Sequence, residues 1–297
     1  MLVGHLKQIW RYPVKSMGGE VIDSAILCNQ GIPGDRCWAV IDTEEREIRS
    51  AKRWPELMNF KAALASTDAP APETYLDQLP SVAITCPDGT TFDSRSEGAG
   101  ALLASQLQRP ASLAPLAPST DVDHYRLARE RTDQSLSEEM GLLPGEAMPD
   151  FTASMSDVLA SLAEHVTPPG TYFDAFPLHL MTTNSLRYLS EAGGVNAVVE
   201  RYRPNLLIEP TASLAEMTEN NWVECCLQIG NAVIYIESRT VRCSMPAREQ
   251  QWCELAAEPG MARAMVNHCD RHLGVNVMVV QHGSIEAGDE IHLLEKN

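Results

Sequence analysis

The sequence predicts an α+β protein that is rich in strands, with a β-barrel in its C-terminal part and a smaller N-terminal domain of mixed α/β structure. Short stretches of β-forming residues recur along the chain, and turn signals such as QGIPGDR and CPDGTT separate them. Stretches with helical spacing are few, which favours a barrel over a helical bundle. The 297 residues, 44% of them apolar, suffice for one large domain or two modest ones with hydrophobic cores.

The N-terminal part alternates in β fashion and closes with a helix. The expected strands are residues 5–14, 20–27, 37–44 and 46–50. SRSEGAGALLASQLQ, residues 94–108, predicts a helix. Residues 110–122 are rich in Pro, Ala and Ser and predict a linker. We therefore divide the chain into residues 1–115 and residues 116–297.

The C-terminal part begins with helices and then returns to strands. Residues 148–166 contain one helix by their apolar spacing, and TTNSLRYLSEAGG contains a second, with Thr183 or Asn184 as N-cap and Gly193 as terminator. A later helix, within residues 256–274, is expected to stop at Gly274. The expected strands are residues 203–209, 225–238, 240–245, 275–285 and 289–295.

Charge and cysteine content exclude several classes of protein. The net charge of −17 argues against nucleic acid or an anionic membrane as partner, and no apolar run is long enough to span a bilayer. The N-terminus does not have the pattern of a signal peptide, so we expect a cytoplasmic protein. The eight cysteines include no zinc-type CxxC pair and are expected to be reduced.

Four short basic motifs stand out against this acidity. YPVKS, GDRCW, RYRPNLLIE and VRCSMP each place a Lys or Arg at a strand end. Taken singly, each is typical of a solvated strand-end charge beside a turn. Four of them in one acidic chain favour a shared anionic ligand.

The order of these motifs carries a family resemblance. YPVKS, GDRCW, FDAFPLHLMTTNSL, RYRPNLLIE, W..C.LQIG, RC.MP and HGSIEAGDEIHLL follow one another along nearly the whole chain. Together they resemble the MOSC family, which is named for the C-terminal domain of molybdenum-cofactor sulfurases. The layout is similar to that of the YcbX-type proteins and the mitochondrial amidoxime reducing component. The resemblance implies a MOSC N-terminal β-barrel-like domain at 1–115 and a MOSC-type barrel at 116–297.

The resemblance also implies a molybdenum cofactor, a pterin with a dithiolene and a terminal phosphate, and the family additionally carries an association with pyridoxal phosphate. Cys243 would be the ligand of the metal. The residues implied to hold the pterin and phosphate are Lys15, Ser16, Arg36, Arg203 and Arg242. A soft thiolate suits a metal already bound to sulfur, and Arg is a natural bidentate partner for phosphate.

Alternatives stay open for three residues. From its own surroundings alone, Cys243 is typical of a buried strand cysteine. Asp174 is either an acid/base near the metal or a turn-capping carboxylate. Cys253 is either a redox partner of Cys243 or a bystander thiol.

Three stretches depart from the family pattern. Met245, Pro246, Ala247 and Arg248 replace a TTVDP-type segment. Asp174-Ala175-Phe176 replaces Asp-Thr-Ser, and Asn276 replaces a tyrosine. The cysteines do not form the iron–sulfur cluster of YcbX-type proteins.

Three functions therefore compete. The first is a molybdenum-cofactor oxidoreductase that reduces small N-hydroxylated compounds. Its electrons would come from a separate ferredoxin-, flavodoxin- or cytochrome-type protein. The second is a sulfur or cofactor carrier that uses Cys243 without turnover. The third is a binding module that has lost its cofactor, against which the retained basic and thiol positions argue.

Overall fold

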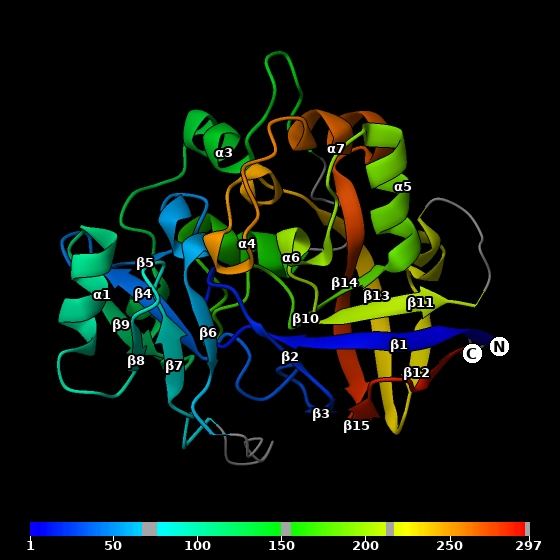
Figure 1. Ribbon diagram of the computed structural model, residues 1–297, viewed down its shortest axis with the longest axis horizontal. Coiled ribbons are helices and arrows are strands. Elements are labelled where there is room, and N and C mark those ends of the chain that lie inside the picture. Colours follow the sequence, from blue (N-terminus) through cyan, green and yellow to red (C-terminus); the bar gives the residue numbers. More distant parts are fainter. Residues whose placement is uncertain (67–75, 150–155, 212–216, 295–297) are drawn as a thin grey trace.

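Seven strands close into a barrel that forms the centre of the computed structural model (Figure 1). The model describes residues 1–66, 76–149, 156–211 and 217–294. The barrel strands are, in spatial order, β1 (Leu2–Arg11), β11 (Leu206–Pro210), β10 (Leu178–Thr182), β14 (His272–Gln281), β13 (Ala232–Val241), β12 (Cys226–Ile229) and β16 (Glu290–Leu293). Neighbouring strands run antiparallel except β10 and β11, which are parallel.

Alternation along the strands explains how the barrel fills its interior. In β13 every second residue from Ala232 to Ser238 is buried, and Ile234 and Ile236 are fully enclosed. Leu6 and Ile9 of β1 and Ile208 of β11 join the same core. The closing pair, β1 with β11, joins segments about 200 residues apart along the chain. The N-terminal strand thus completes a barrel otherwise built from C-terminal residues.

Two small sheets form a second core beside the barrel, at the left of Figure 1. One consists of β5 (Glu47–Arg49), β4 (Trp38–Asp42) and β9 (Ala111–Pro115), and the other of β6 (Lys61–Leu64), β7 (Val82–Thr85) and β8 (Thr91–Asp93). Helix α1 (Ala99–Leu107) covers them, as the sequence predicts. Two further short strands extend the fold: β2 (Glu20–Ile22) pairs with β1, and β3 (Ser24–Leu27) pairs with β15 (Gly283–Glu286).

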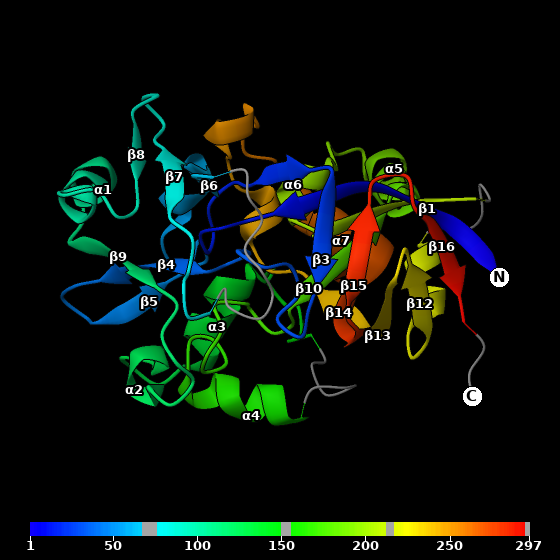
Figure 2. The same cartoon turned by 90° about the horizontal axis from the view of Figure 1, so that it is seen from below.

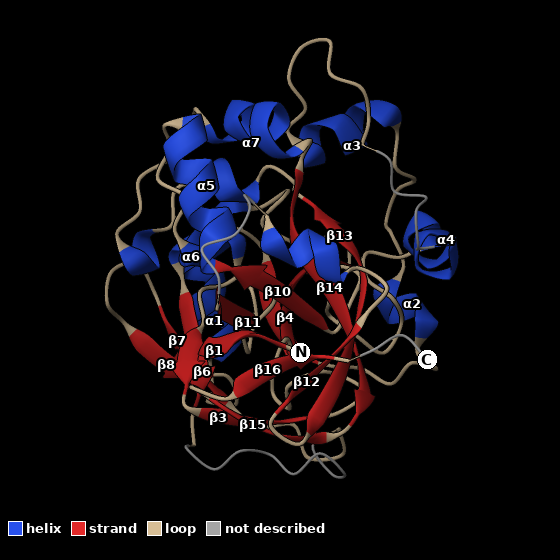
Figure 3. Ribbon diagram, turned by 90° about the vertical axis from the view of Figure 1, so that its right-hand side faces the viewer, coloured by secondary structure: helices blue, strands red, loops and turns tan. Residues whose placement is uncertain are grey.

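Helices cover one end of the barrel and one side of the molecule. Helices α5 (Thr183–Gly193) and α7 (Met261–Cys269) share an apolar cluster and lie beside each other above the strands (Figure 3). The short helix α6 (Val199–Tyr202) leads into β11. Helices α2 (Val122–Tyr125), α3 (Asp133–Met140) and α4 (Ser156–Glu164) gather on the face shown at the bottom of Figure 2. Short 3-10 turns span 55–59, 218–222, 245–247 and 251–253.

The structure corrects several local predictions. The predicted strand at 225–238 is divided into β12 and β13, and the one at 275–285 into β14 and β15. The predicted strand at 240–245 is only the end of β13, followed by a loop and a 3-10 turn. Residues 111–115 of the predicted linker form β9, because their backbone groups pair with β4 at Ala39↔Ala114. The predicted strand at 20–27 is broken into β2 and β3. The N-cap of α5 is Thr182, whose side chain accepts from the Ser185 amide, and Gly194 rather than Gly193 is the C-cap. Helix α7 ends at Cys269, and Gly274 lies within β14.

The predicted helix at 148–166 is confirmed over its described residues as α4, while residues 150–155 lie outside the described part. The division at residues 115 and 116 stays a prediction. Within the described ranges no helix combines the length and apolarity needed to cross a membrane.

Candidate functional site

A cavity of about 920 Å³ opens where the barrel, the small sheets and helices α2 to α4 meet. All seven site residues that the sequence singled out line it: Lys15, Ser16, Arg36, Asp174, Arg203, Arg242 and Cys243. Among the residues that the structure describes, nine Lys or Arg side chains line the cavity against four Asp or Glu, although the whole chain carries a net charge of −17. A concentration of cations against the overall charge makes the cavity suitable for an anionic ligand.

Lys15 lies in the turn after β1 and is almost completely buried. Its Nζ donates to the Tyr172 carbonyl at 3.0 Å and to Asp174 Oδ1 at 2.6 Å. Burial lowers the pKa of Lys15, and the neighbouring Asp174 opposes this shift. Ser16 beside it accepts a hydrogen bond from the Ala51 amide at 2.9 Å. The turn is thereby fixed against the segment that follows β5.

Asp174 faces the cavity with 56% of its side chain exposed. Burial alone would raise the pKa of Asp174, but Lys15 and Lys52 outweigh it and hold that pKa well below its usual range. Lys52 Nζ lies 3.8 Å from Asp174 Oδ2. A carboxylate held ionised in this way is a weak base and a poor proton donor near neutral pH. The structure therefore favours an electrostatic role for Asp174, and its predicted catalytic role stays a prediction.

Arg36 and Arg203 share one aromatic ring. The Arg203 guanidinium lies 4.3 Å and that of Arg36 5.3 Å from the centre of the Tyr12 ring. Arg36 donates to Asp35 and, at 3.2 Å, to Asn205 Oδ1, whereas Arg203 donates to the Met17 carbonyl. Burial, assisted by Arg36, lowers the pKa of Arg203 to about 10. Asp35 pairs with Arg36, whereas the only hydrogen bond of the Arg203 guanidinium among the described residues goes to a neutral carbonyl, so the two cations together carry more positive charge than Asp35 compensates. This excess favours an anion at this end of the cavity.

Arg242 is buried at the end of β13 and only part of its guanidinium is satisfied. Nη2 donates to the Tyr202 carbonyl at 2.9 Å and Nη1 to His179 Nε2 at 3.3 Å. Burial and Arg242 hold the pKa of His179 well below its usual range, so its imidazole is neutral and accepts this bond. Arg242 Nε is buried without a hydrogen-bond partner among the described residues. A buried donor in that state favours a ligand that would satisfy it.

Cys243 lies in the loop between β13, which ends at Val241, and the 3-10 turn at Met245–Ala247. Its side chain is half-buried and its sulfur forms no disulfide. The interpretation of Cys243 as a buried strand cysteine is therefore wrong on both counts. Cys253 is also half-buried and free, but it is not among the residues that line the cavity.

The donor set suits a metal that brings most of its own ligands. Among the described residues, no group of three or more His, Cys, Asp or Glu side chains is arranged to hold a metal ion. A bare cation would also meet the repulsion of the surrounding Lys and Arg side chains. One accessible thiol surrounded by cations instead fits a thiophilic metal within an anionic cofactor. The residues present therefore fit the group that the family resemblance implies.

Sequence reasoning missed several residues of this cavity. Lys52 comes after β5 in a stretch with no motif of its own, and Asn205 is inside the quoted RYRPNLLIE stretch without attracting notice. His179 lies in FPLHLM, between apolar residues typical of a buried strand. Each is recognisable only from its neighbours in space. Asn276, where the family pattern has tyrosine, also lines the cavity and accepts from Thr240 Oγ1 at 2.9 Å.

Two family models match this chain. The family model described as "MOSC domain" matches residues 167–292, and the one described as "MOSC N-terminal beta barrel domain" matches residues 3–109. The comparison with curated proteins found no match.

Similar solved structures include YiiM from Geobacillus stearothermophilus, with 19% identity, a TM-score of 0.31 and 40% of this chain covered. YiiM from Escherichia coli has 17% identity, a TM-score of 0.31 and 41% of this chain covered. The chain spans about half the length of these two proteins, 55% and 56%. The YUAD protein from Bacillus subtilis has 12% identity and a TM-score of 0.44, with 99% of this chain and 97% of that chain covered.

Proposed function

The chain belongs to the MOSC-domain family, and from this premise we propose that its cavity binds a molybdenum cofactor with Cys243 as the protein ligand of the metal. The observation that carries the proposal is the meeting of one half-exposed thiol, three buried cations (Lys15, Arg203 and Arg242) and the partly buried Arg36 in a single cavity. Those cations come from turns that lie up to 227 positions apart along the chain, between Lys15 and Arg242. Soluble anionic cofactors are bound by this combination of fixed positive charge and enclosed volume.

The chain's own residues would hold and orient the group. Lys15 and Arg203 offer buried cations to a phosphate, the partly buried Arg36 offers a third, and Arg242 offers its unsatisfied Nε–H. Ser16 offers its hydroxyl proton, since its oxygen already accepts from Ala51. When bound, the cofactor supplies two-electron redox chemistry at molybdenum. The ionised Asp174 pairs with Lys15 at 2.6 Å and opposes the lowering of the Lys15 pKa by burial.

The reaction we propose is the reduction of small N-hydroxylated compounds. An N–OH group takes two electrons and two protons, the N–O bond breaks, and the products are an N–H group and water. The electrons would come from a separate ferredoxin-, flavodoxin- or cytochrome-type protein, and a net charge of −17 favours a partner with a basic face. The cavity would exclude bulk water and hold the substrate against the reactive group.

The alternative is a sulfur or cofactor carrier in which Cys243 acts without substrate turnover. It is favoured by the segment after Cys243, which forms a 3-10 turn with Pro246 and departs from the family pattern. The cations of the cavity suit both functions, so only turnover separates them.

The test begins with protein purified from a host that makes molybdopterin. Molybdenum and pterin are measured, and benzamidoxime reduction is assayed with an artificial electron donor. We expect Cys243→Ala to lose the metal and the activity. Cys253→Ala is the matched control, because Cys253 is also half-buried but outside the cavity. Equal metal content in wild type and Cys243→Ala would contradict both proposals, and stoichiometric metal without turnover would leave only the carrier.

Arg203→Ala tests the phosphate end of the cavity. Removing this buried guanidinium should weaken cofactor retention by the ~1.5–3 kcal/mol typical of a hydrogen bond to a charged group. Pterin retained after dialysis gives the measurement. Unchanged retention would exclude Arg203 from cofactor binding.

A further inference from the structure

The segment that joins the two family domains forms a large part of the cavity wall. We call residues 122–149 and 156–166 the bridging segment; they lie between the matched ranges 3–109 and 167–292. Eleven of the thirty-one residues that line the cavity belong to it. Six of them are apolar: Leu127, Leu136, Met140, Leu162, Ala163 and Val166. The other five are charged, two of them basic and three acidic: Arg126, Glu130, Arg131, Glu139 and Glu164. This mostly apolar wall without an excess of positive charge thus differs in chemistry from the end of the cavity that Lys15, Arg36 and Arg203 line.

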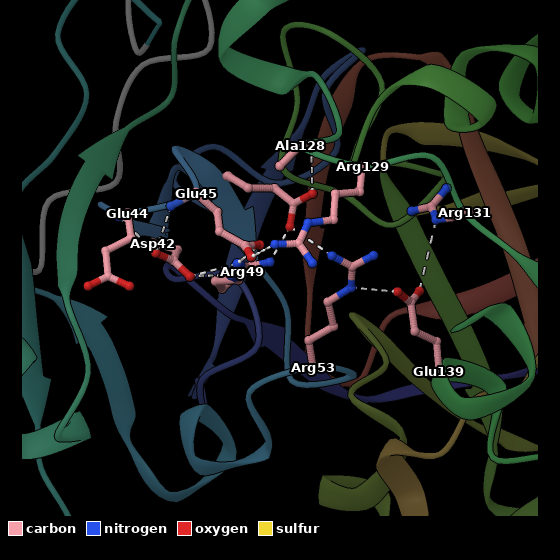
Figure 4. A network of polar contacts seen from close by, with 10 residues as sticks. Asp42, Glu44, Glu45, Arg49, Arg53, Ala128, Arg129, Arg131 and Glu139 are labelled. Carbon is pink, nitrogen blue, oxygen red and sulfur yellow. Dashed lines mark hydrogen bonds and ion pairs between the residues drawn. The ribbon is translucent and has the colours of Figure 1, made fainter. Parts of the chain in front are cut away.

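An ion-pair network fixes the bridging segment to the small sheets (Figure 4). Glu47, almost completely buried in β5, accepts from the Ala128 amide at 2.9 Å and pairs with Arg53 at 2.9 Å. Arg53 in turn pairs with Glu139 of α3 at 2.8 Å. Glu47 holds the backbone at Ala128, and Arg53 holds Glu139. Because these contacts exist without a ligand, this part of the wall is preorganised for binding.

A second set of bonds holds the bridging segment to the loop that carries Cys243. The Glu139 carbonyl accepts from Ser244 Oγ at 3.0 Å, one residue beyond the thiol. Arg271, 2% exposed, donates to the carbonyls of Met140 at 3.2 Å and Gly141 at 2.8 Å, and its own carbonyl accepts from the Arg242 amide at 2.8 Å. The apolar wall therefore begins directly beside Cys243.

We propose that the bridging segment is the substrate-recognition wall of the cavity and that it selects substrates with an apolar, aryl-sized body. This inference rests on the proposed function for the position of the reacting group beside Cys243. Lys15, Arg36 and Arg203 would hold the cofactor's phosphate and pterin at the cationic end, so the body of a substrate would lie against the half-exposed side chains of Leu127, Leu136 and Leu162. Burial of apolar surface against these side chains supplies the selectivity.

The first test needs no cofactor. Binding of the neutral apolar fluorophore N-phenyl-1-naphthylamine is titrated against cofactor-free wild type, Leu127→Asn and Leu136→Asn. Each variant should bind the probe about tenfold more weakly, the range for lost apolar contact in a pocket. Leu142→Asn is the control, since Leu142 is half-buried in the same segment but does not line the cavity. Leu136→Met, which keeps an apolar side chain at this position, should bind the probe about as tightly as wild type. Thermal unfolding checks that each variant folds.

The second test uses the loaded enzyme. Leu136→Asn should raise KM for benzamidoxime more than for acetamidoxime, with kcat little changed, because only the aryl body meets the wall. No probe binding in wild type, unchanged binding in both lining variants, or equal weakening in Leu142→Asn would each overturn the inference. A protein without molybdenum contradicts the proposed function while the probe titration still decides this inference.

Discussion

Replacing Glu146 by glutamine should loosen the loop that carries Cys243. Glu146 accepts from Arg271 through both carboxylate oxygens, with Nη2 to Oε2 at 2.8 Å. Arg271 is 2% exposed, and its remaining donors face carbonyls, so the variant leaves a buried cation with only part of its compensation. Breaking a buried pair outright costs about 3–5 kcal/mol. Glutamine keeps one acceptor, so we expect a loss of about 2 kcal/mol, which corresponds to a Tm lower by about 5 °C.

The loosening should be visible at the thiol itself. Alkylation of Cys243 by iodoacetamide, followed by peptide mass spectrometry on cofactor-free protein, should be faster in Glu146→Gln, by about tenfold for each 1.4 kcal/mol lost from loop closure. Glu20→Gln is the matched control, because Glu20 pairs with the buried Arg11 at 2.8 Å and neither residue lines the cavity. It should lower Tm without changing alkylation. Equal alkylation rates in the two variants would refute the reasoning.

The ion pair between Glu146 and Arg271 should make the free energy of unfolding depend on pH. The hydrogen bond from Arg271 holds the pKa of Glu146 below its ordinary value. A carboxyl whose folded pKa is lowered contributes stability above its unfolded pKa, and that contribution is lost as the pH falls through the folded pKa. The difference in unfolding free energy between wild type and Glu146→Gln should therefore be full at neutral pH and shrink in acid. A difference that stays constant down to the acid transition would contradict this linkage.

Two further substitutions test the cavity and its support. Asp174→Asn removes the anion that pairs with Lys15, so it should strengthen the binding of inorganic phosphate to cofactor-free protein. The expected gain is about fivefold, which corresponds to the ~1 kcal/mol of a partly exposed ion pair. Calorimetric titration measures the affinity, and weaker binding in the variant would contradict the electrostatic role of Asp174. Gly274→Ala should lower the unfolding free energy by about 2–4 kcal/mol in denaturant titration, since its Cβ would lie 2.3 Å from His179 Nε2 and its φ is +78°. Gly288→Ala is the control, because Gly288 has a φ of +99° but no atom within 4 Å of an added Cβ, so this variant has backbone strain without a clash. An equal loss of unfolding free energy in the two variants would show that the contact with His179 adds nothing.

The strand content of the fold could be predicted from alternation, but its closure could not. The apolar residues of β12 and β13 predict strand structure from sequence alone, but as one strand at 225–238, whereas the structure has a hairpin of two strands. The pairing of β1 with β11 depends on contacts between residues about 200 positions apart, which no local pattern encodes. Residues 111–115 show the same limit, since Pro, Ala and Ser indicate a linker while a neighbouring strand supplies the partner for their backbone.

The sequence predicts the site residues that belong to recognisable motifs, but not those that reach the site only through the folding of the chain. Lys15, Arg203 and Cys243 come from motifs whose order resembles a family pattern, and the structure brings them to one cavity. Lys52 and Arg271 belong to no such motif. Arg271 follows the end of α7, where a basic residue is ordinarily a solvated helix-end charge, and its role depends on carbonyls more than a hundred positions away.

Three of the predicted cofactor-binding residues share a strained backbone conformation. Ser16, Arg36 and Arg203 have φ values of +69°, +45° and +55°, in the left-handed region that costs a non-glycine residue about 1–3 kcal/mol. Fixed partners maintain these conformations, as where the Arg36 amide donates to the Tyr12 carbonyl at 2.8 Å. Glycine would relieve the strain at each position but would remove the hydroxyl or guanidinium that faces the cavity. Three strained turns that present polar groups to the same volume are what a preorganised anion site requires, because donors already held in place lose little entropy on binding.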